Sequence, residues 1–163
     1  MIGNKIYNLC KILFPYNRSL TGNGNRATFN ILKKHCSKLK IKQVPSGGKV
    51  FDWIVPKEWN VKEAWIKDPN NKKIADFSKN NLHLVGYSKR IRKQISLKKL
   101  EKKLHYLKQL PNAIPYVTSY YKEDWGFCIS YNTKKKLKNG QYKVLIDSQL
   151  KKGNLTYGEI LIP

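Results

Sequence analysis

The sequence predicts an α+β fold: a helix pair at the amino-terminal end, a β-rich middle that carries one amphipathic helix, and a strand pair at the carboxyl end. Three observations predict it. Apolar residues recur at helical spacing near the start, and short β-branched and aromatic segments separated by turn residues follow from residue 41. After Ser96, four leucines lie on one face of a helix.

The two helices of the pair are expected on either side of a glycine-containing loop. Apolar residues recur at helical spacing from Ile2 to Leu13, and Pro15 ends this helix because proline cannot continue it. A second helix is expected over residues 25–39, after a loop that contains Gly22 and Gly24.

Strands are expected next. The apolar segments that turn residues separate are 41–44, 49–55, 64–67, 73–77 and 82–87. Ser96 is a plausible N-cap for the amphipathic helix, which we expect to run through Leu107. Residues 113–128 are expected to form two strands joined at 122–125, followed by a short helix at 133–137. Strands at 141–147 and 154–162, joined by a turn at 151–153, form the expected hairpin at the end.

The chain has a formal net charge of +23, which is typical of proteins that bind nucleic acid or another acidic polymer. However, only four of its 33 basic residues are arginine, the residue that grips phosphates and bases in two places. Lysine, asparagine, isoleucine and tyrosine are all abundant, as AT-rich codons would produce. We therefore favour codon bias over nucleic-acid binding, and keep a stand-alone basic binding module as the alternative.

The composition indicates a folded protein rather than a membrane protein or a disulfide-rich one. No apolar run approaches the roughly 18 residues that a membrane span requires, and no signal-peptide cleavage site is visible, so a cytoplasmic location is expected. Cys10, Cys36 and Cys128 are widely spaced in apolar surroundings, and we expect them to be buried.

Residues with catalytic or metal-binding chemistry form no recognisable set. His35, His83 and His105 lack the spacing of a metal-binding helix, and the ten acidic residues are scattered. Ser19 and Ser119 have no obvious histidine partner and no nucleophile elbow. The sequence therefore predicts no catalytic residue, no metal ligand and no cofactor in this chain.

Six ordered motifs cover nearly the whole chain. They are residues 18–26 (Arg-Ser-Leu-Thr-Gly, then Gly24 and Arg26), 44–47 (Val-Pro-Ser-Gly), 50–59 (Val-Phe-Asp-Trp, then Val-Pro and Glu-Trp), 114–121 (Ile-Pro-Tyr, then Thr-Ser-Tyr-Tyr) with 125–128 (Trp-Gly-Phe-Cys), 146–148 (Ile-Asp-Ser), and 155–159 (Leu-Thr-Tyr-Gly-Glu) with 162–163 (Ile-Pro). In this order the motifs resemble the amino-terminal part of a bacterial aminopeptidase-like family related to the di-zinc exopeptidases.

The resemblance implies an incomplete piece of an α/β zinc-peptidase-like fold. Residues 1–44 would be the helical start of the peptidase-like domain, 45–150 an inserted β-rich domain, and 151–163 the first strand that returns to the peptidase-like domain. In that family the zinc ligands follow the Ile-Pro strand, so none has a position here. The resemblance implies zinc only in the complete protein, with the carboxyl-terminal catalytic portion as partner and a peptide as substrate.

The resemblance also implies a role for a few side chains as a substrate wall or lid, and these candidates are Arg18, Trp53, Tyr120, Tyr121 and Trp125. For the tryptophans, burial in a core is the competing interpretation. Arg18 could instead fix the loop between the first two helices, as could Arg26. The acidic turn at Glu123 and Asp124 could meet a peptide amine, although a solvated turn is favoured.

Overall fold

The computed structural model describes residues 2–162, which divide into two compact units. Within the described residues, the first unit comprises residues 2–60 and 150–162, and the second comprises residues 61–149. Each unit has its own buried side chains. The predicted assignment of residues 1–44, 45–150 and 151–163 to parts of a larger peptidase-like fold stays a prediction.

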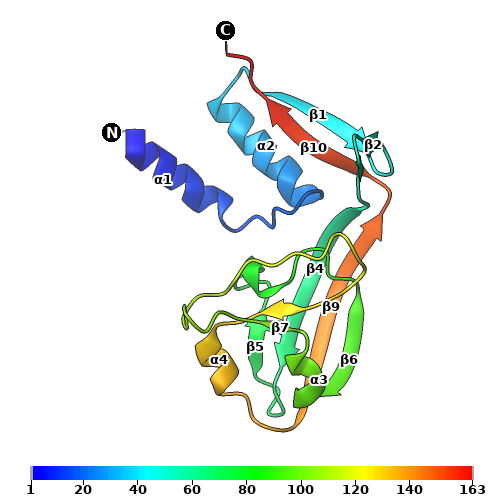
Figure 1. The fold of residues 1–163 in the computed structure, drawn as a ribbon. Helices are drawn as coiled ribbons and strands as arrows, with labels where there is room; N and C mark the ends of the chain where they lie inside the picture. Colours follow the sequence, from blue (N-terminus) through cyan, green and yellow to red (C-terminus); the bar gives the residue numbers. More distant parts are fainter. Residues whose placement is uncertain (1, 163) are drawn as a thin grey trace. The chain divides into compact units, whose positions relative to one another are not determined.

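The first unit contains two helices and two small antiparallel sheets (Figure 1). Its elements are α1 (Ile2–Leu13), α2 (Asn23–His35), β1 (Lys40–Pro45), β2 (Lys49–Val50), β3 (Trp53–Ile54) and β10 (Asn154–Glu159). β1 pairs with β10 so that Lys40 lies opposite Glu159 and Pro45 lies opposite Asn154. The chain therefore returns at its carboxyl end to a strand laid down more than 100 residues earlier.

Both predicted helices of this unit are confirmed, and α2 begins at a glycine that the fold requires. Gly22 precedes α2 with a φ of 103°, a left-handed conformation that side chains disfavour. A Cβ atom at this position would lie 2.3 Å from the carbonyl oxygen of Trp59. The glycine thus lets the start of α2 approach the backbone at Trp59, which is buried.

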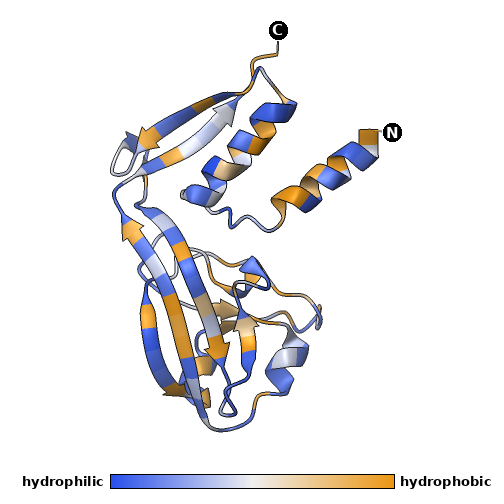
Figure 2. Cartoon of the chain, turned by 180° about the vertical axis from the view of Figure 1, so that it is seen from behind, coloured by the Kyte–Doolittle hydropathy of each residue, from blue (hydrophilic) through white to orange (hydrophobic). Residues whose placement is uncertain are grey.

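Helix α1 carries apolar side chains that the described residues leave exposed. Leu13 is buried and Leu9 is half-buried, whereas Ile2, Ile6, Tyr7, Ile12 and Phe14 are exposed. Figure 2 shows hydrophobic positions recurring along this helix. An apolar helix face of this kind normally packs against another element.

The second unit is built on a four-stranded sheet in the order β5-β4-β9-β6 (Figure 1). Its elements are β4 (Glu58–Lys67), β5 (Lys73–Asp76), the 3₁₀ helix η1 (Asn81–His83), β6 (Ile91–Ser96), α3 (Leu97–Glu101), β7 (Leu104–His105), β8 (Phe127–Cys128), α4 (Tyr131–Lys135) and β9 (Gln141–Lys151). The first residues of β4 and the last residues of β9 are assigned to the first unit. β9 alternates in burial: Tyr142, Val144, Ile146 and Ser148 face the interior, as expected for a strand with one buried face. This mixed architecture confirms the predicted α+β class.

Several details of the predicted helices and strands are wrong. Residues 49–55 form two short strands, because Phe51 adopts a left-handed φ of 54° and turns the chain. The helix after Ser96 ends at Glu101, because Leu104 pairs in a parallel strand with Phe127. Most of the expected strand over 82–87 is replaced by η1 and isolated bridges. The expected hairpin between the last two strands does not form, because β10 pairs with β1 instead.

The cysteine prediction holds for one residue of three: Cys128 is buried, Cys36 is half-buried and Cys10 is exposed. Within residues 2–162, no helix has the length and apolar character that crossing a membrane would require.

Candidate functional site

Residues 113–128 follow an irregular path rather than forming the two expected strands. Their backbone is held at separate points: Gly86 N–H donates to the Val117 carbonyl at 2.8 Å, and Ser119 N–H donates to the Gly86 carbonyl at 2.9 Å. Further along, Lys89 N–H donates to the Asp124 carbonyl at 2.9 Å. The segment contributes only Phe127 and Cys128 to a strand. An irregular backbone fixed at such points can present side chains on one side of the unit.

A pocket of about 350 Å³ lies beside this segment, within the second unit. Two of the predicted wall residues, Tyr121 and Trp125, line it together with His105, Ser119, Asp124 and Val85. Its size falls in the range of pockets that bind small ligands or single side chains. The structure therefore brings part of the predicted set to one concave site.

The acidic group of this pocket is paired rather than free. The Lys103 ammonium lies 2.5 Å from Asp124 Oδ1, and the N–H of Trp125 donates to the same oxygen at 2.8 Å. The hydrogen bond from Lys103, followed by that from the backbone, lowers the pKa of Asp124. Lys103 also lies 5.8 Å from the centre of a Trp125 ring, so one cation touches both the acid and the aromatic wall.

His105 forms another part of the lining. Desolvation lowers its pKa, and the nearby Lys103 charge acts in the same direction, while Asp124 opposes both. A pKa below the usual value of 6.5 favours the neutral imidazole at pH 7. A neutral imidazole offers a hydrogen bond without adding charge to the pocket.

The tyrosines of the segment form a short ring cluster. Tyr120 meets the buried Tyr87 edge to face, with ring centroids 6.0 Å apart, and lies 4.1 Å from the ring of Tyr121. A hydrogen bond with Tyr121 raises the pKa of Tyr120. Tyr121 itself is 79% exposed. The buried Tyr87 thus packs against Tyr120, and the exposed Tyr121 lines the pocket.

The other two predicted wall residues belong to the first unit. Arg18 is exposed in the loop before α2, and Trp53 is half-buried in β3 opposite Val50. Trp59 belongs to the core. The predicted roles of Arg18 and Trp53 in a wall or lid stay predictions.

The first unit contains a polar network centred on Glu58, which the sequence did not single out. Arg26 donates to both carboxylate oxygens of Glu58, at 2.6 and 3.0 Å, and Asn60 Nδ2 donates at 2.9 Å. The N–H of Asn154 completes the set at 3.2 Å. These hydrogen bonds, led by the one from Arg26, outweigh desolvation and lower the pKa of Glu58 to about 2.

This network fixes Arg26 as a structural residue, in line with the alternative weighed for the loop arginines. In the sequence, Glu58 appeared only as part of the motif Glu58-Trp59. Its network could not be predicted, because two of its partners, Arg26 and Asn154, lie 32 and 96 positions away along the chain. Every oxygen of the carboxylate is in use, so it is not free to act as an acid or base.

Metal-binding residues do not converge within the described residues. Across positions 2–162, no group of three or more His, Cys, Asp or Glu side chains could hold a metal ion. His83 uses Nδ1 to contact the Cys128 carbonyl at 2.8 Å, and burial raises the pKa of the Cys128 thiol to about 12. A zinc site needs at least three deprotonated ligands, so this donor set does not fit zinc.

Two comparisons with known proteins find relatives with similar descriptions. The chain is 49% identical, over 98% of its length, to a Clostridium acetobutylicum protein named "putative polysaccharide biosynthesis protein with aminopeptidase-like domain". It also matches the crystal structure of a "putative peptidase" from the same organism, with 48% identity and a TM-score of 0.91 over 96% of this chain. In both comparisons the chain spans 37% of the relative's length.

A family model described as a domain of unknown function, DUF2172, matches residues 58–149. The match takes in the four-stranded sheet, the aromatic segment and the pocket beside it. Because it covers more than half of the 163 residues, the chain belongs to the DUF2172 family.

Proposed function

We propose that this chain works as the amino-terminal part of a longer, zinc-dependent, aminopeptidase-like hydrolase, and that it is inactive on its own. The names and greater lengths of the relatives support an aminopeptidase-like protein. The observation that carries the inactivity is the donor set, because no three potential metal ligands converge within residues 2–162. Zinc would be bound by residues that this chain does not supply.

In this proposal the pocket beside residues 117–125 helps to shape where a peptide lies. Its aromatic walls, Tyr121 and Trp125, suit an apolar or aromatic side chain. Neutral His105 and the hydroxyl of Ser119 add hydrogen-bonding groups at its edge. A cytoplasmic location and the wall or lid roles of Arg18 and Trp53 belong to the same proposal.

The exposed apolar face of α1 also supports a larger protein. Ile2 is 78% exposed and Ile6 is 57% exposed, although both lie on the helix. Burying a side chain of this kind contributes roughly 1.5–3 kcal/mol of stability. A further part of the polypeptide that packed on this face would therefore be held there strongly. We propose that the carboxyl-terminal catalytic portion covers this face.

The first test is an activity assay on the purified chain. With added zinc and an aminoacyl p-nitroanilide, we expect no hydrolysis above a blank that contains zinc alone. Turnover that survives repeated purification, and that a chelator abolishes, would contradict the proposal.

The second test is a binding titration followed by NMR. A tripeptide with an amino-terminal phenylalanine should shift the indole N–H signal of Trp125, and triglycine should shift it far less. Trp125→Ala should abolish the shifts of neighbouring signals, whereas Trp65→Ala, at another half-buried tryptophan of the unit, should not. Equal responses to both peptides would mean that the pocket recognises no apolar side chain.

A further inference from the structure

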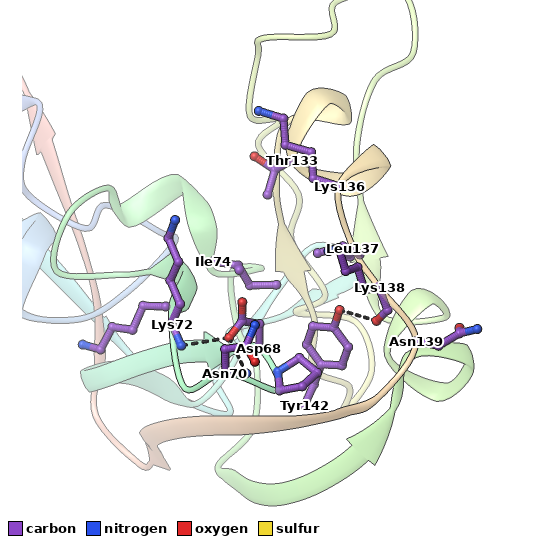
Figure 3. A pocket seen from close by; sticks show the side chains of 12 residues that line it. Asp68, Asn70, Lys72, Ile74, Thr133, Lys136, Leu137, Lys138, Asn139 and Tyr142 are labelled. Carbon is purple, nitrogen blue, oxygen red and sulfur yellow. Dashed lines mark hydrogen bonds between the residues drawn. The ribbon is translucent and has the colours of Figure 1, made fainter.

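A second and larger pocket lies in the unit formed by residues 61–149. Its volume is about 530 Å³, and it opens between the turn that joins β4 to β5 and the segment that joins α4 to β9 (Figure 3). None of its lining residues lines the pocket beside residues 117–125. Neither the family description nor the relatives' names assign it a ligand.

The turn on one side of this pocket is held firmly by its own hydrogen bonds. Asp68 Oδ1 accepts from the N–H groups of Asn70 and Lys72, at 2.9 and 2.8 Å (Figure 3 shows these bonds). Asn71 adopts a left-handed φ of 62°, a conformation that asparagine tolerates better than most residues. Its side chain accepts from Lys143 Nζ at 2.9 Å, which ties the turn to β9.

The opposite side is fixed to the same turn. Gly140 packs so closely that a Cβ atom there would lie 2.5 Å from the Pro69 ring. The Tyr142 hydroxyl donates to the Lys138 carbonyl at 2.8 Å, and Figure 3 shows the tyrosine ring between the two sides. The pocket is therefore formed before any ligand arrives, which lowers the entropic cost of binding.

Most of the charged side chains that line the pocket are positive. Four lysines line it, and only Lys73 has a carboxylate partner, Asp76, at 2.9 Å. Within residues 2–162, the ammonium groups of Lys72, Lys136 and Lys138 form no ion pair. The single lining carboxylate, Asp68, already accepts two backbone hydrogen bonds. Three exposed lysines without a carboxylate partner thus line the pocket from two sides.

The remaining lining is part polar, from Asn70, Thr133 and Asn139, and part apolar. Pro69, Ile74 and Leu137 contribute the apolar side chains, together with the ring of Tyr142. An apolar and aromatic wall beside a cationic rim suits a ligand with an anionic head and a less polar body. The high net charge of the whole surface does not distinguish this place, but the concave shape, the fixed turns and the apolar wall do.

We propose that this pocket binds a small organic phosphate, with Lys72, Lys136 and Lys138 contacting the phosphate and Tyr142 with Leu137 contacting the organic part. A phosphate group offers several acceptor oxygens, and lysine binds it as a mobile point charge. The pocket volume of about 530 Å³ fits a molecule of the size of a sugar phosphate better than a polymer strand.

The test is calorimetric titration of the purified chain with ribose 5-phosphate at 150 mM salt, with ribose as the uncharged control. We expect saturable binding of one ribose 5-phosphate per chain and no heat from ribose. The double variant Lys72→Gln/Lys136→Gln should weaken binding at least tenfold, because it removes two of the three cations proposed to contact the phosphate.

The matched control is Lys98→Gln/Lys99→Gln, which removes the same charge from exposed positions on α3. Its affinity should stay within twofold of the parent, and thermal melting should show that both variants fold. Equal weakening in the two variants would mean general charge attraction and would overturn the proposal, as would the absence of saturable binding in the parent chain.

Discussion

Glu58 in the first unit and Asp124 in the second are both carboxylates that lie against a cation, but their surroundings differ. Glu58 is buried, with a side chain 7% exposed, and is bound on both oxygens by the planar guanidinium of Arg26. Asp124 is about one-third exposed and contacts the flexible ammonium of Lys103 at the wall of a pocket. The buried pair holds distant parts of the chain in place, whereas the exposed pair can exchange partners when a ligand enters.

Removing the buried carboxylate should have the largest effect. Glu58→Ala removes the carboxylate that accepts from Arg26, Asn60 Nδ2 and the Asn154 N–H, and Arg26 keeps its bond to Asn23. We expect the free energy of unfolding to fall by about 3–5 kcal/mol, measured by chemical denaturation, because breaking a buried pair leaves an uncompensated charge. Glu123→Ala, which removes an exposed carboxylate, is the control and should change stability by less than about 0.5 kcal/mol. A similar loss in both variants would mean that burial of Glu58 has no special consequence.

The same pair should also govern the acid stability of the chain. The pKa of Glu58 is depressed from its ordinary value of 4.5 to about 2 in the folded state. The stabilisation is therefore complete above about pH 5 and is lost as the pH falls toward 2, and it amounts to at most about 3 kcal/mol. Denaturation curves at several pH values should show this slope in the parent chain and a clearly smaller slope in Glu58→Ala. Parallel slopes would contradict the assigned pKa.

Local patterns in the sequence predicted the elements that local forces determine. The helix from Ile2 to Leu13 and the turn between the segments 64–67 and 73–77, where Asp68 lies, both follow from spacing and turn chemistry within a few residues. The prediction that the helix after Ser96 extends through Leu107 was wrong, because the long-range pairing of Leu104 with Phe127 outweighs the helical spacing of the leucines. Local sequence patterns carry no information about such pairings.

The same distinction applies to the sites. Tyr121 and Trp125 were predicted together because they lie in one segment, and they do line one pocket. His105 could not be connected with them from the sequence, because β7 brings it there by pairing with β8. Arg26 and Glu58 are 32 residues apart, and the bond between them depends on the fold of the whole first unit.

Removing the exposed carboxylate should have the smallest effect on stability and a measurable effect on its neighbour. Asp124→Asn should lower the free energy of unfolding by less than about 1 kcal/mol, as is usual for a partly exposed ion pair. Because Asp124 raises the pKa of His105 while Lys103 lowers it, the variant should lower the pKa of His105 further. An NMR pH titration can follow this change, with His105→Gln used to assign the signal.

Glu123→Gln is the matched control for this titration, since it removes one negative charge from the neighbouring, exposed position. It should move the pKa of His105 less than Asp124→Asn does, because Glu123 is not among the charges that shift this imidazole. A larger shift in the control, or an upward shift in Asp124→Asn, would mean that the imidazole does not sense the Lys103–Asp124 pair. A lower pKa of His105 in Asp124→Asn, with a smaller change in Glu123→Gln, would establish that Asp124 acts on the electrostatics of the pocket. Glu58, in contrast, acts on stability.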